Sequence, residues 1–158
     1  MGIRYYAYPI TAADYPRALI APCSFHGSDP LMDAWDPQEG ASEMLYLDKC
    51  WNELQALLTS AEGEADRPAL QLVDGIVTVT CEGWIPVERA LSPEEVKAVA
   101  DDLATVAESD VRRIASQFQR SNESEQMEYD YITQFLAAAQ GFTASLANDG
   151  RGLVYRIG

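Results

Sequence analysis

Residues 3–8 read Ile-Arg-Tyr-Tyr-Ala-Tyr, a run of β-branched and aromatic side chains that stops at a proline. Such residues favour the pleated backbone of a sheet, so this run predicts a strand near the start of the chain. Alternation along the strand places Tyr6 and Tyr8 on one face and Tyr5 on the other. Residues 153–157 are short and rich in β-branched side chains, and they predict a second strand near the other end.

Helical periodicity dominates the sequence between these two strands. Ser92-Pro93-Glu94-Glu95 has the composition of a capping box followed by a proline in the first turn, which predicts a helix start. Thr11 is a candidate cap for a short helix over 12–20, although Pro16 within it disfavours a helix. The apolar spacing predicts further helices from a cap at Ser42 to Leu58, from Ser109 to Phe118 and over 125–148.

Two strands are expected in the middle of the chain. Residues 76–81 alternate, with Val77, Val79 and Cys81 on one face, which predicts a half-buried strand. Residues 83–87 favour an edge strand because they contain a proline. The resulting order of elements predicts an α+β fold over residues 1–158: a single domain with a small, mostly antiparallel sheet, including the two terminal strands, packed against several helices.

Residues 21–41 form the longest stretch without a regular pattern, and prolines and glycines interrupt it. Long irregular segments in compact domains are often functional. The stretch also carries apolar side chains, which we expect to hold it against the body of the molecule: Phe25, Leu31, Met32 and Trp35.

The chain is strongly acidic, with 25 Asp and Glu against 11 Lys and Arg and a formal net charge of −14. The negative charge is most concentrated in residues 61–110, which contain twelve acids and three bases. Nucleic-acid phosphates and anionic membrane surfaces repel such a chain, so neither is expected as a partner. The acidity serves solubility, or it attracts a basic protein partner.

The sequence gives no sign of export or of membrane insertion. No apolar run approaches the ~18 residues of a membrane-spanning helix, and residues 1–6 lack the apolar core of a signal peptide. The three cysteines have no close pairing that would indicate a disulfide framework or a zinc ribbon. We therefore expect a cytoplasmic protein with reduced thiols.

Motifs of the common enzyme classes are missing: there is no phosphate loop, dinucleotide glycine pattern or nucleophile elbow. The only histidine, His26, stands three residues after Cys23, a spacing that permits a shared metal ion or an activated thiol. Both need further groups that the sequence does not identify, so packing of the loop is the favoured interpretation. No catalytic residue, metal site or cofactor is predicted, and the sequence favours a non-enzymatic protein over an enzyme without excluding the latter.

Several segments together resemble the YfbM-like family of bacterial proteins of unknown function. These segments lie between residue 1 and residue 155, so the resemblance extends along nearly the whole chain: residues 1–6, 47–58, 91–96 and 131–155. The most specific element is Leu-Asp-Lys-x-Trp at residues 47–51. The resemblance implies one cytoplasmic α+β domain, and it supplies no reaction, cofactor or catalytic residue.

The same motif contributes to a candidate ligand site. On the predicted helix Asp48, Lys49 and Trp51 share one turn; Trp51 anchors the helix to the sheet or, with its neighbours, lines a ligand site. The residues considered for ligand binding are His26, Asp48, Lys49, Trp51 and Tyr6.

Two function classes follow. The first is a non-enzymatic binding module for a basic protein, comparable to an immunity protein or an inhibitor. The second is a small-molecule-binding protein or enzyme with a pocket under the 21–41 loop, beside Trp51 and the tyrosines of the first strand. Self-association through an exposed strand edge is a third possibility, and we expect a monomer or a weak homodimer.

Overall fold

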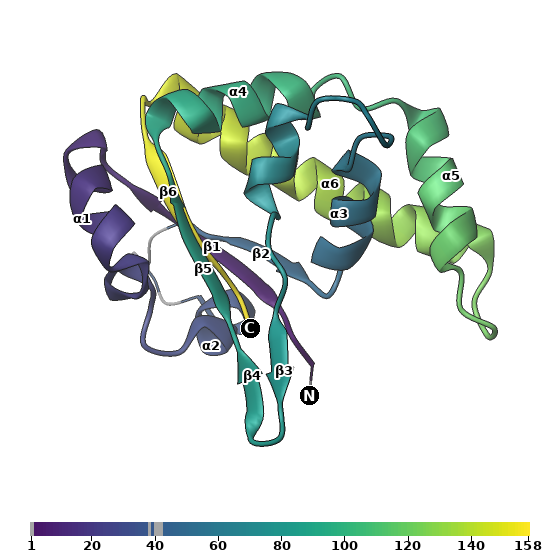
Figure 1. The fold of residues 1–158 in the computed structure, drawn as a ribbon, viewed down its shortest axis with the longest axis horizontal. Helices are drawn as coiled ribbons and strands as arrows, with labels where there is room; N and C mark the ends of the chain where they lie inside the picture. The colour runs from purple at the N-terminus through teal and green to yellow at the C-terminus, as the bar shows by residue number, and fades with distance from the viewer. Residues whose placement is uncertain (1, 38, 40–42) are drawn as a thin grey trace.

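A four-stranded antiparallel sheet runs through the middle of the molecule (Figure 1). The computed structural model describes residues 2–37, 39 and 43–158. The strands lie in the order β2-β1-β6-β5, and their bounds are Leu45–Asp48, Tyr5–Ile10, Gly152–Ile157 and Val87–Leu91, respectively. The terminal strands β1 and β6 pair along their whole length at the centre of the sheet. The predicted α+β class, with both terminal strands in one antiparallel sheet, is confirmed.

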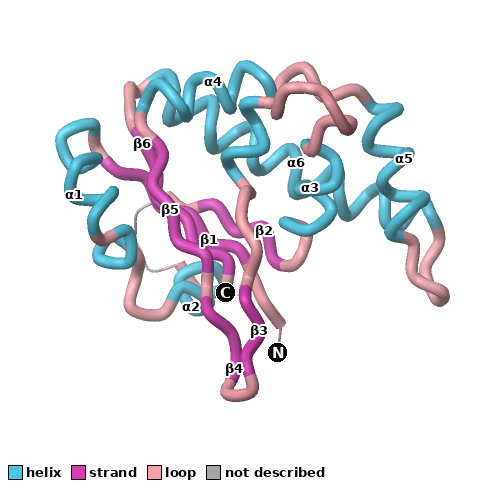
Figure 2. Tube along the Cα trace, in the orientation of Figure 1, coloured by secondary structure: helices cyan, strands magenta, loops and turns pink. Residues whose placement is uncertain are grey.

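Helices cover both faces of this sheet, as Figures 1 and 2 show. On one side lie η1 (Ala12–Asp14), α1 (Tyr15–Ile20), η2 (Pro22–Phe25) and α2 (Pro30–Trp35). On the other side lie α3 (Trp51–Leu58), η3 (Pro68–Leu72), α4 (Pro93–Leu103), α5 (Glu108–Phe118) and α6 (Glu125–Asn148). No helix in the described ranges is long and apolar enough to cross a bilayer.

The larger core lies between the sheet and helices α3 to α6. Tyr5 and Ala7 face it from β1, and Tyr155 and Ile157 face it from β6, all fully buried. The rings of Tyr5 and Tyr155 stack with their centroids 5.4 Å apart. This core is the layer on which the helices of the candidate site rest.

A smaller core lies on the opposite face, where the predicted alternation places Tyr6 and Tyr8. Phe25 and Leu31 of the 21–41 segment pack against it, as expected. Met32 and Trp35 do not, because they lie on the outer side of α2 and are 52% and 65% exposed. The segment is also more regular than expected, since it contains η2 and α2. Its residues 38, 40 and 41 lie outside the described part of the chain.

The helix predicted from Ser42 to Leu58 is wrong in its first half. Ser42 lies outside the described residues, and Leu45–Asp48 forms strand β2, which pairs with β1. The sequence Leu-Tyr-Leu buries Leu45 and Leu47 by strand alternation. The helical interpretation instead placed Leu47 on one stripe with Met44, Trp51 and Leu54. Asp48 ends the strand with a φ of +47°, and the helix starts only at Trp51.

The half-buried strand predicted over 76–81 is also wrong. Only Thr78–Thr80 form a strand, β3, and all three residues are exposed. It pairs with β4 (Gly83–Ile85) in a hairpin separate from the main sheet. After Pro86 the chain continues as β5, which was not predicted beyond residue 87 and which pairs with β6. Because β5 takes this edge of the sheet, the hairpin is left projecting outward (Figure 1).

Two of the predicted helix starts agree closely with the structure. At the start of α4 the Ser92 side chain accepts from the Glu95 backbone N–H, and the Glu95 carboxylate accepts from the Ser92 backbone N–H. Thr11 caps η1 by accepting from the Asp14 backbone N–H. Helix α6 has the predicted bounds of about 125–148.

Candidate functional site

Asp48 is the centre of a polar cluster at the end of β2. Its Oδ1 atom accepts hydrogen bonds from Arg4 Nε and Tyr46 Oη, both at 2.9 Å, and its Oδ2 atom accepts from Tyr131 Oη at 3.4 Å. Burial acts to raise the pKa of Asp48, but the hydrogen bonds from Tyr46 and Arg4 outweigh it and hold the pKa below its ordinary value. Asp48 is therefore a fixed negative charge that joins β1, β2 and α6.

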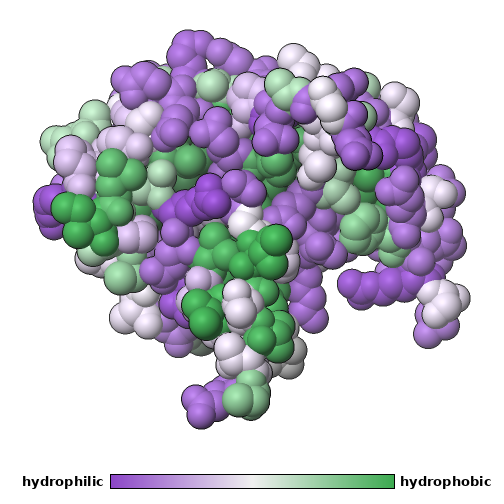
Figure 3. All heavy atoms as spheres, viewed as in Figure 1, coloured by the Kyte–Doolittle hydropathy of each residue, from purple (hydrophilic) through white to green (hydrophobic). Residues whose placement is uncertain are grey.

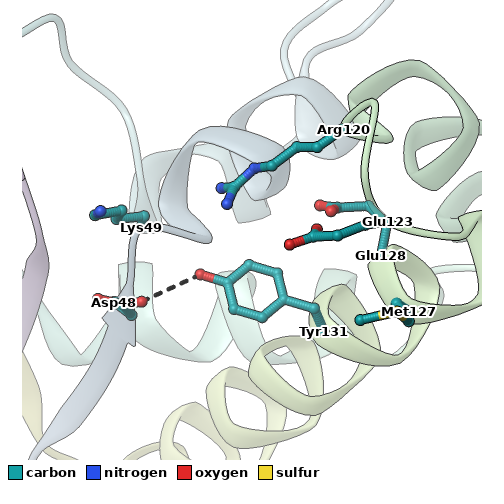
Figure 4. Close-up of a pocket in the computed structure, with 7 residues that line it drawn as sticks. All are labelled: Asp48, Lys49, Arg120, Glu123, Met127, Glu128 and Tyr131. Carbon is teal, nitrogen blue, oxygen red and sulfur yellow. Dashed lines mark hydrogen bonds between the residues drawn. The ribbon is translucent and has the colours of Figure 1, made fainter.

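A cavity of about 260 Å³ opens beside this cluster. We call it the Asp48 pocket, and its lining residues are Asp48, Lys49, Arg120, Glu123, Met127, Glu128 and Tyr131. In Figure 4 the carboxyl groups of Glu123 and Glu128 point toward the space between Arg120 and the ring of Tyr131. One wall comes from the β2–α3 turn, and the other comes from the α5–α6 connection and the first turns of α6, which follow it directly in the sequence.

Glu128 is the most unusual residue of the pocket, because it is only 3% exposed and its side chain forms no hydrogen bond or ion pair with the described residues. Glu53 of α3 is 6% exposed, and its Oε2 atom is buried without a partner among the described residues. Burial raises the pKa of both carboxyl groups. The negative charge of Glu128 raises the pKa of Glu53 further.

Other groups nearby are also shifted by burial. Cys50 lies in the same region, and burial together with the charge of Glu53 raises the pKa of its thiol, so it is no nucleophile at neutral pH. Burial likewise raises the pKa of Tyr131, which stays protonated and donates to Asp48. Among residues 2–37, 39 and 43–158 no group of three metal-ligating side chains is arranged to hold a metal ion.

The two cations of the pocket are exposed. Neither Lys49 nor Arg120 forms an ion pair in the described part of the chain. Arg120 acts on Glu128 and Glu53 electrostatically and lowers the pKa of each, but less strongly than burial raises it. The ammonium group of Lys49 points away from the two glutamates (Figure 4).

A different feature marks the β3–β4 hairpin, where large apolar side chains face solvent. We call these residues the hairpin surface: Ile76, Val79, Trp84 and Ile85, which are 88%, 74%, 42% and 59% exposed. Figure 3 shows hydrophobic residues gathered over this projection. A two-stranded hairpin with both faces in water gains little from such side chains, so their stabilising contribution to the fold is small.

The five residues considered from the sequence do not form one site. Asp48 and Lys49 both line the Asp48 pocket. Trp51 begins α3, packs partly buried against the larger core, and donates from Nε1 to the Ile3 carbonyl. Because Asp48 ends a strand, the three residues do not share one helical turn as predicted.

Tyr6 and His26 lie in the smaller core. Tyr6 is buried and stacks on Tyr46. His26 stacks on Tyr8, and neither of its ring nitrogens has a partner in the described structure. Burial, with the charge of Arg156, lowers the pKa of His26 to about 4, so the ring is neutral at pH 7. A second cavity of about 270 Å³ lies between α1 and β5, and neither cavity is lined by His26.

The sequence interpretation missed Glu128, Glu53 and Arg120. Helical spacing could have identified the first two as buried. Glu128 stands four residues before the buried Ile132, and Glu53 stands four residues before the buried Leu57. A carboxylate on the buried face of a helix is uncommon, and it indicates a special environment. Arg120 carried no such signal, because its place depends on how the α5–α6 connection folds.

Comparisons with known proteins agree with this fold and leave the site unassigned. A search of curated proteins finds no match. Among solved structures, the chain is similar to the crystal structure of YfbM from Escherichia coli, a protein of unknown function, at 17% identity and a TM-score of 0.58. The match covers 99% of this chain and all of that one. The family described as "Domain of unknown function (DUF1877)" matches residues 1–155, so the chain belongs to that family, and the resemblance to YfbM-like proteins is confirmed.

Proposed function

We propose that this protein is a non-enzymatic binding module that docks a basic protein through the hairpin surface. The exposed apolar side chains of that surface carry the proposal. Clustered apolar groups on a soluble protein often mark a site of contact with another molecule. Trp84 belongs to the residue types that anchor protein interfaces, and the neighbouring Val79 and Ile85 supply apolar area on both strands.

The charge of the molecule supports a basic partner rather than a second copy. At −14, two copies repel each other, whereas a positively charged protein is attracted and meets this one faster. Residues 61–110, which include the hairpin, hold twelve of the 25 acids. The occupant we propose is therefore a protein of net positive charge with an apolar patch, comparable to the target of an inhibitor.

The first experiment identifies the partner by contact. A photo-crosslinking amino acid replaces Val79 on the hairpin, and in a matched protein it replaces Ile20, which is 87% exposed on α1. We expect a basic protein to be crosslinked from position 79 and not from position 20. A crosslinked protein with an acidic surface, or equal products from both positions, contradicts the proposal.

The second experiment measures binding of the purified partner. The double variant Val79→Ser, Ile85→Ser is expected to weaken binding by about tenfold or more, because it removes one large apolar side chain from each face of the hairpin. Ile20→Ser is the control and leaves binding unchanged. The affinity of the wild type should also fall as NaCl rises from about 0.05 to about 0.5 M, because salt screens attraction between opposite charges. Binding that is insensitive to the double variant refutes the hairpin surface as the docking site.

A further inference from the structure

We propose that the Asp48 pocket is a binding site for a small organic cation, whose ammonium group lies against the carboxyl groups of Glu128 and Glu123. The observation behind it is Glu128 itself, which is 97% buried and lines the cavity, and whose carboxyl group forms no hydrogen bond or ion pair with the described residues. Figure 4 shows its carboxyl group directed into the cavity. This proposal is independent of the hairpin surface and of its partner.

The relative burial of the charges favours a cation over an anion. A buried carboxylate that accepts no hydrogen bond destabilises the protein. A ligand that donates hydrogen bonds to Glu128 removes this destabilisation, and the gain contributes to its binding free energy. Lys49 and Arg120 are exposed and remain solvated, so an anion gains little from them. Glu53 Oε2, in the same region, is a fully buried oxygen without a partner among the described residues.

The other walls suit the carbon chain of an alkylammonium ion. Met127 and the ring of Tyr131 supply apolar surface, and an aromatic face attracts a cation. The carboxylate of Asp48 already accepts from Arg4, Tyr46 and Tyr131. Asp48 therefore positions the Tyr131 ring, while Glu128 and Glu123 remain available to the ligand.

The chemistry recognised is an ammonium group on a short aliphatic chain, and it has two sources. One is a free amine, and the other is a lysine side chain on a peptide. Calorimetric titration of the full chain at pH 7 uses n-butylammonium and 1,4-diaminobutane as free amines, N-acetyl-lysine methylamide as the side-chain probe, and n-butanol as a neutral control of similar shape. We expect at least one amine to bind and n-butanol not to bind.

Two single variants distinguish a cation site from an anion site, because they shift affinity in opposite directions. Glu128→Gln removes the buried charge and should weaken the binding of the amine by about tenfold or more. Arg120→Gln removes the competing cation and should strengthen it. Glu123→Gln, on the same side of the cavity, should weaken it less. Thermal unfolding of each variant verifies that it is folded.

The outcomes are then unambiguous. Preferred binding of the free amines indicates a metabolite-type ligand, and preferred binding of the lysine derivative indicates a protein side chain; both support a cation site. If no amine binds, or if n-butanol binds equally well, the proposal is refuted. It is refuted as well if Arg120→Gln weakens binding, because the arginine would then be part of an anion site, or if Glu128→Gln leaves the affinity unchanged.

Discussion

At Glu128 the burial of the side chain conflicts with its charge. Position 128 lies on the face of α6 that packs against the core, where an apolar side chain is the ordinary choice. A carboxylate there loses much of its hydration, and the side chains of the other described residues donate no hydrogen bond to it. Residues that cost stability in this way are characteristic of binding sites, where the ligand supplies the missing interaction.

The conflict predicts a pH-dependent effect of Glu128→Gln on stability. Because burial raises the pKa of Glu128 in the folded state, its stabilising contribution is complete below the unfolded value of about 4.3 and is lost as the pH rises through the folded value. The variant should therefore raise the free energy of unfolding at pH 7 by roughly 1 kcal/mol. Near pH 4 the two proteins should be equally stable. Urea unfolding at the two pH values measures the difference.

Several charged groups surround Glu128 and affect its pKa, so the control for Glu128→Gln is an exposed glutamate away from them. Arg120 lowers the pKa of Glu128 and Glu123 raises it, both from the α5–α6 connection, while Glu53 lies in the same region on α3. The matched control is Glu62→Gln in the exposed loop after α3, which should change stability little at either pH. A gain from Glu128→Gln that is equally large at pH 4 would show that packing, and not charge, is responsible.

At the scale of elements, the junction between β2 and α3 decides where Asp48 lies. Met44, Leu47, Trp51 and Leu54 fit a helical spacing, whereas Leu45 and Leu47 fit strand alternation, so periodicity alone does not choose. Pairing with β1 favours the strand, and the left-handed φ of +47° at Asp48 separates the strand from the helix. Asp and Asn adopt this conformation more readily than other residues with a Cβ atom.

A series of substitutions at Asp48 separates its backbone role from its hydrogen bonds. Asp48→Asn keeps the backbone preference and an acceptor but loses the charge that pairs with Arg4, so it should be the mildest. Asp48→Gly keeps the backbone and loses all three side-chain bonds. Asp48→Ala loses both and should be less stable than the glycine variant by about 1 kcal/mol, the cost of a left-handed conformation. Urea unfolding ranks the three variants, and an alanine variant as stable as the glycine variant would contradict this role for the backbone.

Helix α4 and the β3–β4 hairpin show what the sequence could and could not predict. The capping box of α4 is local chemistry, complete within Ser92 to Glu95, so its start was predicted correctly. Alternation in residues 76–81 distinguishes two faces but does not say whether either is covered. Coverage depends on β5 pairing with β6, a contact between residues more than 60 positions apart. The pattern of a few neighbouring residues does not identify a pairing partner so far away in the sequence, so the exposure of the hairpin could not be predicted.

The candidate pocket could likewise be predicted only in part, from the residues that a local motif contains. Asp48 and Lys49 stood out because they flank a tryptophan in a recognisable motif. Their neighbours in the pocket, Glu128 and Arg120, come from segments some 70 to 80 residues later, and only the packing of α6 against β2 brings them together. The sequence does not separate His26 and Tyr6 from Asp48 and Lys49, because it does not show which helices cover each face of β1.

At the scale of the whole molecule, charge and the hairpin surface act against each other. A net charge of −14 makes the surface self-repelling, which opposes compaction and keeps copies apart. The exposed apolar residues of the hairpin surface favour association. Screening the charge weakens the first effect without weakening the second, so ionic strength should control both the stability and the association of the free protein.

The resulting prediction concerns the free protein in salt. Raising NaCl from about 0.02 to about 0.5 M should increase the melting temperature by a few °C, because it relieves repulsion among the acidic residues. Over the same range, sedimentation velocity at high protein concentration should detect a monomer at low salt and a weak homodimer at high salt. The variant Val79→Ser, Ile85→Ser should remain monomeric throughout, while Ile20→Ser behaves as the wild type. A dimer that forms best at low salt would contradict this prediction, because charged groups and not the apolar residues of the hairpin surface would then hold the two copies together.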